Sequence, residues 1–462
     1  MNQTAFSNLN LDSVLLENLA TLDYKAMTAI QAQSLPPILE GKDVIGQGKT
    51  GSGKTAAFGL GLLQKLDVKR FRIQSLVLCP TRELADQVAK EIRRLARTVH
   101  NIKVLTLCGG MPFGPQVGSL EHGAHIIVGT PGRIEEHLRK NTLDLAHIDT
   151  LVLDEADRML DMGFHESLDM IIGEIPEQRQ TLLFSATFPN QIKAIAERIM
   201  RQPVMVQVAS THDNSSIQQH FYKVEDDTSR IDALRLLLLH YRPGSTLVFC
   251  NTKQETQEVA NQLRHCGFSA LALHGDLEQK DRDQTLVRFV NKSASVLVAT
   301  DVAARGLDID TLDAVINYQI ARELEVHVHR IGRTGRAGSS GIALTLYSDK
   351  ESYKFAKLAD YLKQTITTEN LPPISLLEGP TYKPPMTTLQ IDGGKKQKVR
   401  PGDILGALTG EYGIEGHQVG KIQIYDNWAF VAVRSDVVRV ALQKLESGKL
   451  KGRSFRVRQL RV

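Results

Sequence analysis

Short apolar runs recur along most of the chain, with helix-patterned segments between them. The runs are apolar throughout and do not alternate with polar residues, which is typical of strands buried on both faces of a parallel sheet. The segments between them, such as 85–99 and 255–266, carry apolar residues at helical spacing. The pattern predicts an α/β fold with two doubly wound parallel-sheet domains in tandem. The runs occupy residues 76–79, 104–108, 126–128, 151–153 and 182–184, and then 247–250, 270–273, 296–298 and 315–316.

Two breaks in this pattern predict the domain boundaries. The polar stretch Ser210–Ser216 predicts a hinge between a first domain at 1–209 and a second at 217–370. Prolines within 371–386 predict a stiff, extended linker. Residues 387–462 then change to a different pattern, which predicts a small α+β domain. Its strands, turn and helix are expected at residues 422–424, 430–433, 426–427 and 437–445.

Composition fits this organisation and narrows the class of protein. The chain has 462 residues, of which 42% are hydrophobic, and at about 150 residues per domain this length predicts about three domains. No apolar run is long enough to span a membrane, and the polar start at 1–10 lacks an export signal. We therefore expect a cytoplasmic protein without membrane contact. The four cysteines form no CxxC pair, which favours buried reduced thiols over a metal site or disulfides.

The charge is unevenly distributed. Residues 387–462 hold 14 Lys and Arg against 7 Asp and Glu, whereas the rest of the chain holds 42 against 45. A basic tail on a near-neutral body indicates an anionic partner for the tail. A merely solubilising surface explains the charge equally well, so charge alone does not decide between the two.

Polar clusters follow nearly every predicted strand. In an open parallel sheet, ligands bind beyond the carboxyl ends of the strands. So many clusters at one edge of each sheet predict a long composite binding site. The clusters lie at residues 80–83, 109–110, 130–133, 154–157 and 185–187 in the first domain, and at 251–253, 274–276 and 300–308 in the second.

A nucleotide site is indicated by the sequence GKTGSGKT at residues 48–55, which follows a short predicted strand at 43–45. It matches the P-loop pattern. Backbone N–H groups around Gly51, Ser52 and Gly53 would wrap phosphate oxygens, Lys54 would reach the β- and γ-phosphates, and Thr55 would ligate Mg²⁺. The start of the following helix adds its positive dipole end. A strand before the loop and a helix after it make a chance glycine-rich turn a poor explanation.

Asp154 and Glu155 follow the predicted strand at 151–153. An Asp at such a strand end is where a P-loop ATPase holds Mg²⁺, and the adjacent carboxylate can orient the attacking water. The alternative is a solvated acidic turn. Three acids within 154–157 would repel one another, which favours the metal-linked role.

Three arginines at a spacing of three, Arg330, Arg333 and Arg336, lie among glycines in the second predicted domain. They suit a phosphate clamp, because guanidinium binds phosphate through two hydrogen bonds. A plain RNA-contacting patch is the alternative. The first domain offers no other obvious arginine finger, which favours catalysis across the two domains.

Together these motifs resemble the DEAD-box RNA helicase family, whose name is spelled by residues 154–157, over about residues 6–347. The resemblance implies two RecA-like domains, ATP rather than GTP, and RNA as the substrate. It implies that Arg333 and Arg336 contact the γ-phosphate, and that Ser185 and Thr187 couple hydrolysis to duplex opening. The residues that it places around the nucleoside are Phe6, Tyr24, Thr28 and Gln31 for adenine and Asp308 for the ribose.

The same resemblance implies a set of RNA contacts that grip the sugar–phosphate backbone, and therefore action without sequence preference. These contacts are Thr81, Arg82, Gly110, Thr130, Arg133, Thr300 and Arg305. The chain departs from the family pattern without losing a catalytic group. The departures are Ala29, Gly48, Gln319 and His327.

The tail is similar to that of the bacterial DEAD-box protein A subgroup, through residues 391–396 and 401–408. That resemblance implies an RNA-recognition-like domain that targets a hairpin of large-subunit ribosomal RNA in pre-ribosomal particles. Trp428 and Phe430 fit part of the aromatic strand signature of such domains, but core packing explains them equally well. RNA binding through basic side chains is the more plausible mode. The candidates are Lys395, Lys396, Lys449, Lys451 and Arg453.

The leading functional interpretation is an RNA-stimulated ATPase that opens or remodels RNA locally, acting on large-subunit ribosomal RNA during ribosome assembly. The alternative is an ATP-controlled RNA clamp that unwinds little. A DNA translocase is a third class, and the DEAD spelling and lack of extra translocation domains disfavour it. ATP and Mg²⁺ are the expected cofactors, and a monomer is the expected state.

Overall fold

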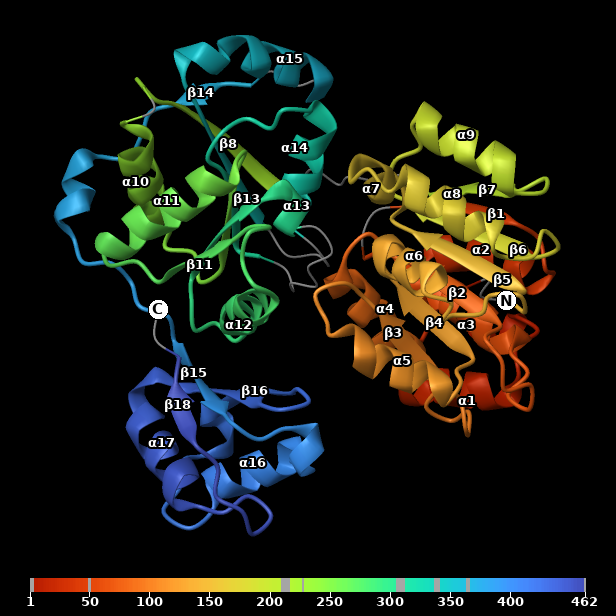
Figure 1. The fold of residues 1–462 in the computed structure, drawn as a ribbon. Helices are drawn as coiled ribbons and strands as arrows, with labels where there is room; N and C mark the ends of the chain where they lie inside the picture. The colour runs from red at the N-terminus through yellow and green to blue at the C-terminus, as the bar shows by residue number, and fades with distance from the viewer. Residues whose placement is uncertain are drawn as a thin grey trace. The chain divides into compact units, whose positions relative to one another are not determined.

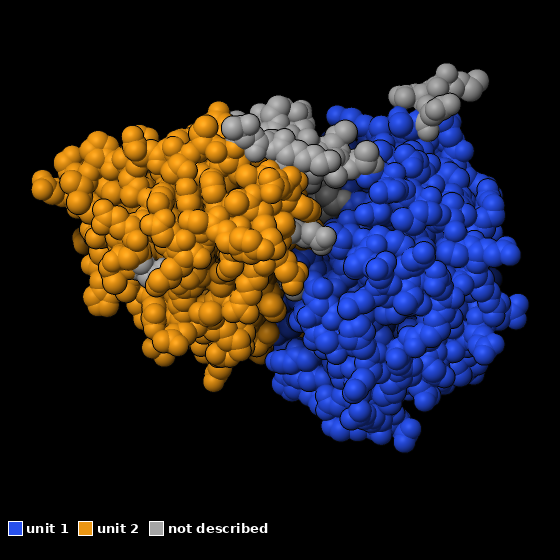
Figure 2. Space-filling view, turned by 90° about the horizontal axis from the view of Figure 1, so that it is seen from above, with its two compact units in different colours: residues 1–211, 306–308 blue, residues 212–305, 309–462 orange. Residues whose placement is uncertain are grey.

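The computed structural model describes residues 4–48, 51–208, 217–226, 228–304, 312–335, 341–362 and 366–460. Within them the chain forms three sheets, two of seven strands and one of four (Figure 1). The two larger sheets are parallel and the small one is antiparallel, as the apolar runs and the changed pattern of the tail predict. By its internal contacts the chain divides near residue 211 into two compact units, coloured separately in Figure 2.

Domain 1 is the first seven-stranded sheet with its helices. Its strand order is β3-β4-β2-β5-β6-β1-β7, and helices cover both faces. The strands are β1 (Val44–Gln47), β2 (Ser75–Leu78), β3 (Val104–Leu107), β4 (Ile126–Gly129), β5 (Thr150–Asp154), β6 (Gln180–Ser185) and β7 (Val204–Gln207). The helices are α1 (Ser13–Thr21), α2 (Ala29–Leu39), α3 (Lys54–Lys65), α4 (Arg82–Leu95), α5 (Phe113–Glu121), α6 (Pro131–Arg139), α7 (Ala156–Asp161), α8 (His165–Gly173) and α9 (Asn190–Ile199).

Domain 2 repeats this plan with the order β10-β11-β9-β12-β13-β8-β14. Its strands are β8 (Ile217–Lys223), β9 (Thr246–Cys250), β10 (Ala270–Leu273), β11 (Val296–Thr300), β12 (Ala314–Asn317), β13 (Gly341–Tyr347) and β14 (Thr368–Glu369). Its helices are α10 (Arg230–Tyr241), α11 (Lys253–His265), α12 (Gln279–Val290), α13 (Asp301–Ala304), α14 (Leu324–Ile331) and α15 (Ser352–Leu362).

The tail is the antiparallel sheet β16-β17-β15-β18 with two helices packed on one face. Alternate residues of the central strand, Ala429, Val431 and Val433, join the core with Ile404 and Leu445 of the helices. The elements are β15 (Met386–Ile391), α16 (Pro401–Thr409), β16 (Val419–Ile424), β17 (Ala429–Arg434), α17 (Val438–Ser447) and β18 (Val457–Gln459), with a 3-10 turn, η5 (Lys395–Gln397).

Helix α4 illustrates how sequence dictates these elements. The side chain of Thr81 accepts a hydrogen bond from the N–H of Leu84 and caps the helix. Residues at helical spacing, among them Leu84, Val88 and Leu95, are buried and turn one apolar stripe to the sheet. The polar clusters consequently begin where strands end and helices start.

Burial agrees with the expectation for the cysteines. Cys79, Cys108 and Cys250 are buried free thiols and Cys266 is partly buried. Burial raises the pKa of Cys108 to about 12, with Asp86 adding to the shift, so that this thiol is inert. In the described part of the chain, no helix combines the length and the apolar character needed to cross a bilayer.

Candidate functional site

The phosphate-binding loop runs from the end of β1 into α3. Lys54 is buried and its Nζ donates to the carbonyl oxygen of Gly48 at 2.6 Å. Gly53 has φ +95°, and a Cβ there would come within 2.5 Å of Gln31 Nε2. Only glycine fits this conformation and this close approach. Lys49 and Thr50 lie outside the described residues, while Thr55 is half-buried at the start of α3.

The adenine-reading candidates form two pairs, one of which lies beside this loop. Gln31 is buried on α2, where its Oε1 accepts from the N–H of Thr28 at 2.9 Å and its Nε2 donates to Gly53 O at 3.1 Å. Phe6 is buried and packs edge-on against the half-buried Tyr24, with ring centroids 6.0 Å apart. The structure therefore brings the candidates together as two pairs, Thr28 with Gln31 and Phe6 with Tyr24.

The acidic pair follows β5. Asp154 is buried, and burial, with help from Glu155 and Asp157, raises its pKa to about 7 although Lys54 pulls it down. Its Oδ1 accepts from the N–H of Glu155 at 3.0 Å. Glu155 has φ +51°, a conformation that non-glycine residues adopt only where the surrounding structure enforces it. Such strain beside a buried carboxylate is typical of a functional position.

The third acid, Asp157, joins this turn to the strand end at Ser185. Its Oδ2 accepts from both the N–H and the Oγ1 of Thr187, at 3.0 and 2.8 Å, and its N–H donates to Ser185 Oγ. Burial raises the pKa of Asp157, but Arg158 and these hydrogen bonds outweigh it, so the net shift is downward. Asp157 thus ties the two predicted coupling residues to the acidic turn.

The RNA candidates of domain 1 lie at the ends of neighbouring strands. Thr81 and Arg82 open α4 after β2, and Gly110, with φ +73°, follows β3. Thr130 directly precedes α6 after β4, and its Oγ1 accepts from Gly109 N–H at 3.4 Å. Arg133 donates to Met111 O at 2.9 Å and pairs with Glu136. The register of β2, β4 and β3 places all of these at one sheet edge.

Domain 2 presents a matching edge, but one predicted arginine has another role. Arg330 is 1% exposed and makes a bidentate ion pair with Asp301, at 2.6 and 2.7 Å. It also donates to Asn251 Oδ1 and to Gln319 O, both at 2.9 Å. The expectation that all three arginines form a phosphate clamp is wrong for Arg330, because a carboxylate and two further oxygens already bind its buried guanidinium.

The other domain 2 candidates are placed only in part. Thr300 ends β11, where its Oγ1 accepts from Ala303 N–H, and Arg333 is half-buried just after α14. Arg305, Asp308 and Arg336 lie outside the described residues, as does the predicted hinge at Ser210–Ser216. Their assigned roles stay predictions.

In the tail, the structure brings two basic segments together. Lys451 Nζ donates to Lys398 O at 2.9 Å, which joins the turn after β15 to the turn before β18. This basic surface, defined by 395–398 and 449–453, includes the exposed side chains of all five tail candidates: Lys395, Lys396, Lys449, Lys451 and Arg453. Clustered exposed cations suit a polyanionic partner.

Aromatic stacking is not available to Phe430. This ring is 0% exposed, with Tyr425 edge-on to it at 5.5 Å. Its register partner Gln390 hydrogen-bonds to Gln284 of α12, and Thr388 on the same face bonds to Ser293. Phe430 is therefore buried on the face of β17 opposite the tail core, whereas Trp428 is partly buried.

Comparisons with known proteins decide the family. The DEAD/DEAH box helicase model matches residues 28–195, the helicase conserved C-terminal domain matches 229–338, and the DbpA RNA binding domain matches 388–459. The chain belongs to the DEAD-box family. The ATP-dependent RNA helicase DbpA of Escherichia coli K12 is 54% identical over 99% of this chain and 100% of its own length. The helicase CshA of Geobacillus kaustophilus is 44% identical over 75% of this chain and 74% of its own.

Solved structures agree with this membership. Dbp5 of Saccharomyces cerevisiae, bound to RNA and ADP–BeF3, aligns with a TM-score of 0.71 at 29% identity, over 80% of this chain and 96% of that one. This DEAD-box protein is thus an ATP-dependent RNA helicase that binds ATP and RNA, and its RNA-stimulated ATPase is the activity expected of the family. The predicted fold class is confirmed as well.

The residues present fit ATP and Mg²⁺. Among the described residues, Ser52 Oγ is buried with no hydrogen-bond partner, and it lies in the loop where phosphate oxygens would be cradled. Asp154 is buried next to two further carboxylates, and a divalent cation would offset the repulsion among their negative charges. Mg²⁺ binds through one or two protein oxygens plus phosphates, so the pair Thr55 and Asp154 suffices.

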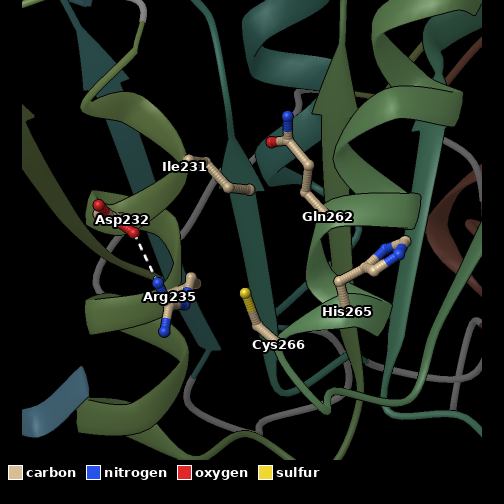
Figure 3. A pocket seen from close by; sticks show the side chains of 6 residues that line it. All are labelled: Ile231, Asp232, Arg235, Gln262, His265 and Cys266. Atoms are coloured by element: carbon tan, nitrogen blue, oxygen red, sulfur yellow. Dashed lines mark hydrogen bonds and ion pairs between the residues drawn. The ribbon is translucent and has the colours of Figure 1, made fainter. Parts of the chain in front are cut away.

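A cavity of about 210 Å³ between α10 and α11 is separate from this machinery (Figure 3). Gln262, His265 and Cys266 line it at the C-terminal end of α11, facing Asp232 and Arg235 of α10. Helix α11 starts at the carboxyl end of β9, so its last turn lies at the opposite edge of the sheet from the helicase motifs. The cavity is therefore not part of the candidate site.

Proposed function

We propose that this helicase remodels large-subunit ribosomal RNA during ribosome assembly. In this proposal the tail selects the RNA, and the two α/β domains hydrolyse ATP and unwind the RNA. The observation that carries the proposal is the tail itself. It matches a DbpA RNA-binding family and gathers two basic segments, 395–398 and 449–453, on one surface. A hairpin of ribosomal RNA is the target that this subgroup's tail implies, and an RNA hairpin supplies the phosphates that such a surface attracts.

In the ATP site, each residue has a distinct task. Lys54 Nζ now donates to Gly48 O. With ATP bound, a phosphate oxygen would replace this carbonyl oxygen as the acceptor. Thr55 and Asp154 would hold Mg²⁺, which neutralises phosphate charge when bound. Glu155 orients and deprotonates the attacking water. Arg333 and Arg336 act as arginine fingers, and Asp308 contacts the ribose.

The network at Asp157 supports unwinding rather than static clamping. Ser185 and Thr187 are bonded to the residue that closes the acidic turn, so a change at Asp154 or Glu155 reaches them directly. Rearranging that turn on hydrolysis would move the end of β6. No comparison favours the clamp alternative. Among the candidate RNA contacts, Thr81 and Arg82 follow β2, which pairs with β5 beside this turn, and Thr130 and Arg133 follow the next strand, β4.

The remaining expectations belong to this proposal. We expect the helicase to work in the cytoplasm, where ribosomes are assembled, and to work as a monomer. Sedimentation of the full chain with and without RNA measures the second point directly.

The test compares full-length protein with a chain that lacks residues 387–462. ATPase stimulation is measured with a large-subunit ribosomal hairpin fragment and with random-sequence RNA. The full chain should prefer the hairpin fragment, and the truncated chain should treat the two RNAs alike while remaining active. Equal responses of the full chain to both RNAs would refute selection by the tail.

A further inference from the structure

The ring of Tyr24 is clamped by two side chains of α4. Its hydroxyl donates to Glu91 Oε1 at 2.6 Å, although the two residues are 67 positions apart. Glu91 Oε2 in turn pairs with Arg94 Nε at 3.4 Å, and the Arg94 guanidinium lies over the Tyr24 ring at 5.4 Å from its centroid. Burial, followed by the hydrogen bond to Glu91, raises the pKa of Tyr24 to about 12, so the phenol stays a donor.

The rest of the ring is also fixed. Phe6 meets Tyr24 edge-on at an interplanar angle of 84°. One face is therefore covered by Arg94, the hydroxyl is bound to Glu91, and an edge is occupied by Phe6. A ring held in this way keeps a constant orientation, as stacking on a flat base requires.

Hydrogen bonds also join α1, the last turn of α4 and the segment that carries Tyr24. The buried side chain of Asn18 donates to the carbonyl oxygens of Arg94 and Leu95, at 3.2 and 2.7 Å, and thereby fastens α1 to the last turn of α4. The N–H of Tyr24 donates to Leu19 O, so the segment that carries Tyr24 continues directly from α1. The backbone of Tyr24 and the side chains that clamp it thus share one anchored unit.

We propose that Glu91 and Arg94 are positioning residues for the base of ATP: they hold the Tyr24 ring in the orientation that stacks on adenine. The proposal rests on the proposed ATP site and on the adenine-reading role that the family resemblance gives Tyr24. Both residues lie in the last turns of α4, whereas the acidic turn and the described part of the phosphate-binding loop follow other strands. Their effect is consequently confined to nucleotide affinity, and the chemical step is left intact.

The test uses full-length protein and measures KM for ATP and kcat under saturating RNA. Glu91→Ala should raise KM about 3- to 10-fold, the effect of losing one hydrogen bond, with kcat unchanged. Tyr24→Phe removes the same hydrogen bond and should match it. Glu91→Gln keeps an acceptor oxygen and should remain close to wild type. In the Tyr24→Phe background, Glu91→Ala should add nothing to the increase in KM.

Lys90→Ala is the matched control, because Lys90 is exposed on the same helix beside Glu91. It should leave KM and kcat unchanged. A wild-type KM in Glu91→Ala, an equal fall of kcat, or additive effects in the double variant would each overturn the clamp. Tyr24→Ala separates the two proposals: unchanged ATP affinity there would refute the adenine role itself, whereas a weakened affinity with a silent Glu91→Ala would refute the clamp alone.

Discussion

The acidic and phosphate-binding edge of domain 1 and the basic surface of the tail differ in how their charged side chains are exposed to solvent. At the edge, Lys54, Asp154, Glu155 and Asp157 are all buried, and hydrogen bonds fix their positions. In the tail, the candidate cations are exposed, and of these side chains Lys451 is the one seen tied to its neighbours.

This difference in exposure determines how much a single side chain contributes to binding or catalysis. A buried charge in a low dielectric acts strongly on one atom and tolerates no displacement. An exposed cation is screened by salt, contributes little by itself, and works only in numbers. Single substitutions at the edge should therefore change rates by orders of magnitude, and those in the tail should change affinity gradually.

The largest expected effect extends the comparison to domain 2. Arg333→Ala should lower RNA-stimulated ATP turnover by about 10³-fold or more, the scale of arginine fingers. Arg322→Ala, an exposed arginine of the same domain, serves as the control and should be silent. Steady-state ATPase with and without RNA measures both. Full RNA stimulation in Arg333→Ala would show that this arginine is not the finger.

Glu155→Gln should reduce ATP hydrolysis by about 10²- to 10⁴-fold, the range for loss of a general base. Lys54, Thr55 and Asp154 remain, so ATP and RNA should still bind, and the variant should stay on RNA in the presence of ATP. Single-turnover hydrolysis and RNA retention on a filter check this. Glu166→Gln, exposed on α8, is the matched control. Turnover near the wild-type rate would remove Glu155 from the mechanism.

Gln31→Ala distinguishes two roles within the edge. The amide reads adenine in the resemblance, yet in this structure it also ties Gly53 O to Thr28 N–H. Loss of base reading should weaken the binding of ATP, raising its KM about tenfold, while the residual use of GTP stays nearly unchanged. Equal losses for ATP and GTP would instead mean that Gln31 only braces the phosphate-binding loop. The measurement is KM for both nucleotides, with the exposed Gln33→Ala as the control.

Much of this architecture follows from local pattern, and the rest depends on contacts that a sequence does not display. Strands such as β5 are buried throughout and were predictable as apolar runs. Strand β8 was not, because its polar residues at 218–220 are only partly covered next to the two-residue edge strand β14. The tail strands β15 and β18 were missed for a related reason: they complete a sheet whose other strands lie far from them in sequence.

For the site, motif residues could be assigned from spacing, but partnerships could not. Nothing in the sequence joins Arg330 to Asp301, or Tyr24 to Glu91, because these pairs form only when distant strand ends and helices meet. Phe430 shows the same limit. An aromatic on a strand is compatible with stacking or with core packing, and only the fold shows that this one is covered.

The smallest expected effect on the ATPase itself lies in the tail. Lys449→Gln with Arg453→Gln should leave turnover at saturating random RNA unchanged, because both residues lie outside every nucleotide motif. Affinity for a ribosomal hairpin should fall, and the plot of log affinity against log salt should flatten by about 0.7–0.9 for each RNA phosphate that the variant no longer neutralises. Arg434→Gln with Arg439→Gln removes the same charge from exposed positions outside the basic surface. If both pairs changed the salt slope alike, net charge alone would explain binding. An effect confined to the first pair would show that the tail, although exposed and screened, still has a defined RNA-binding face.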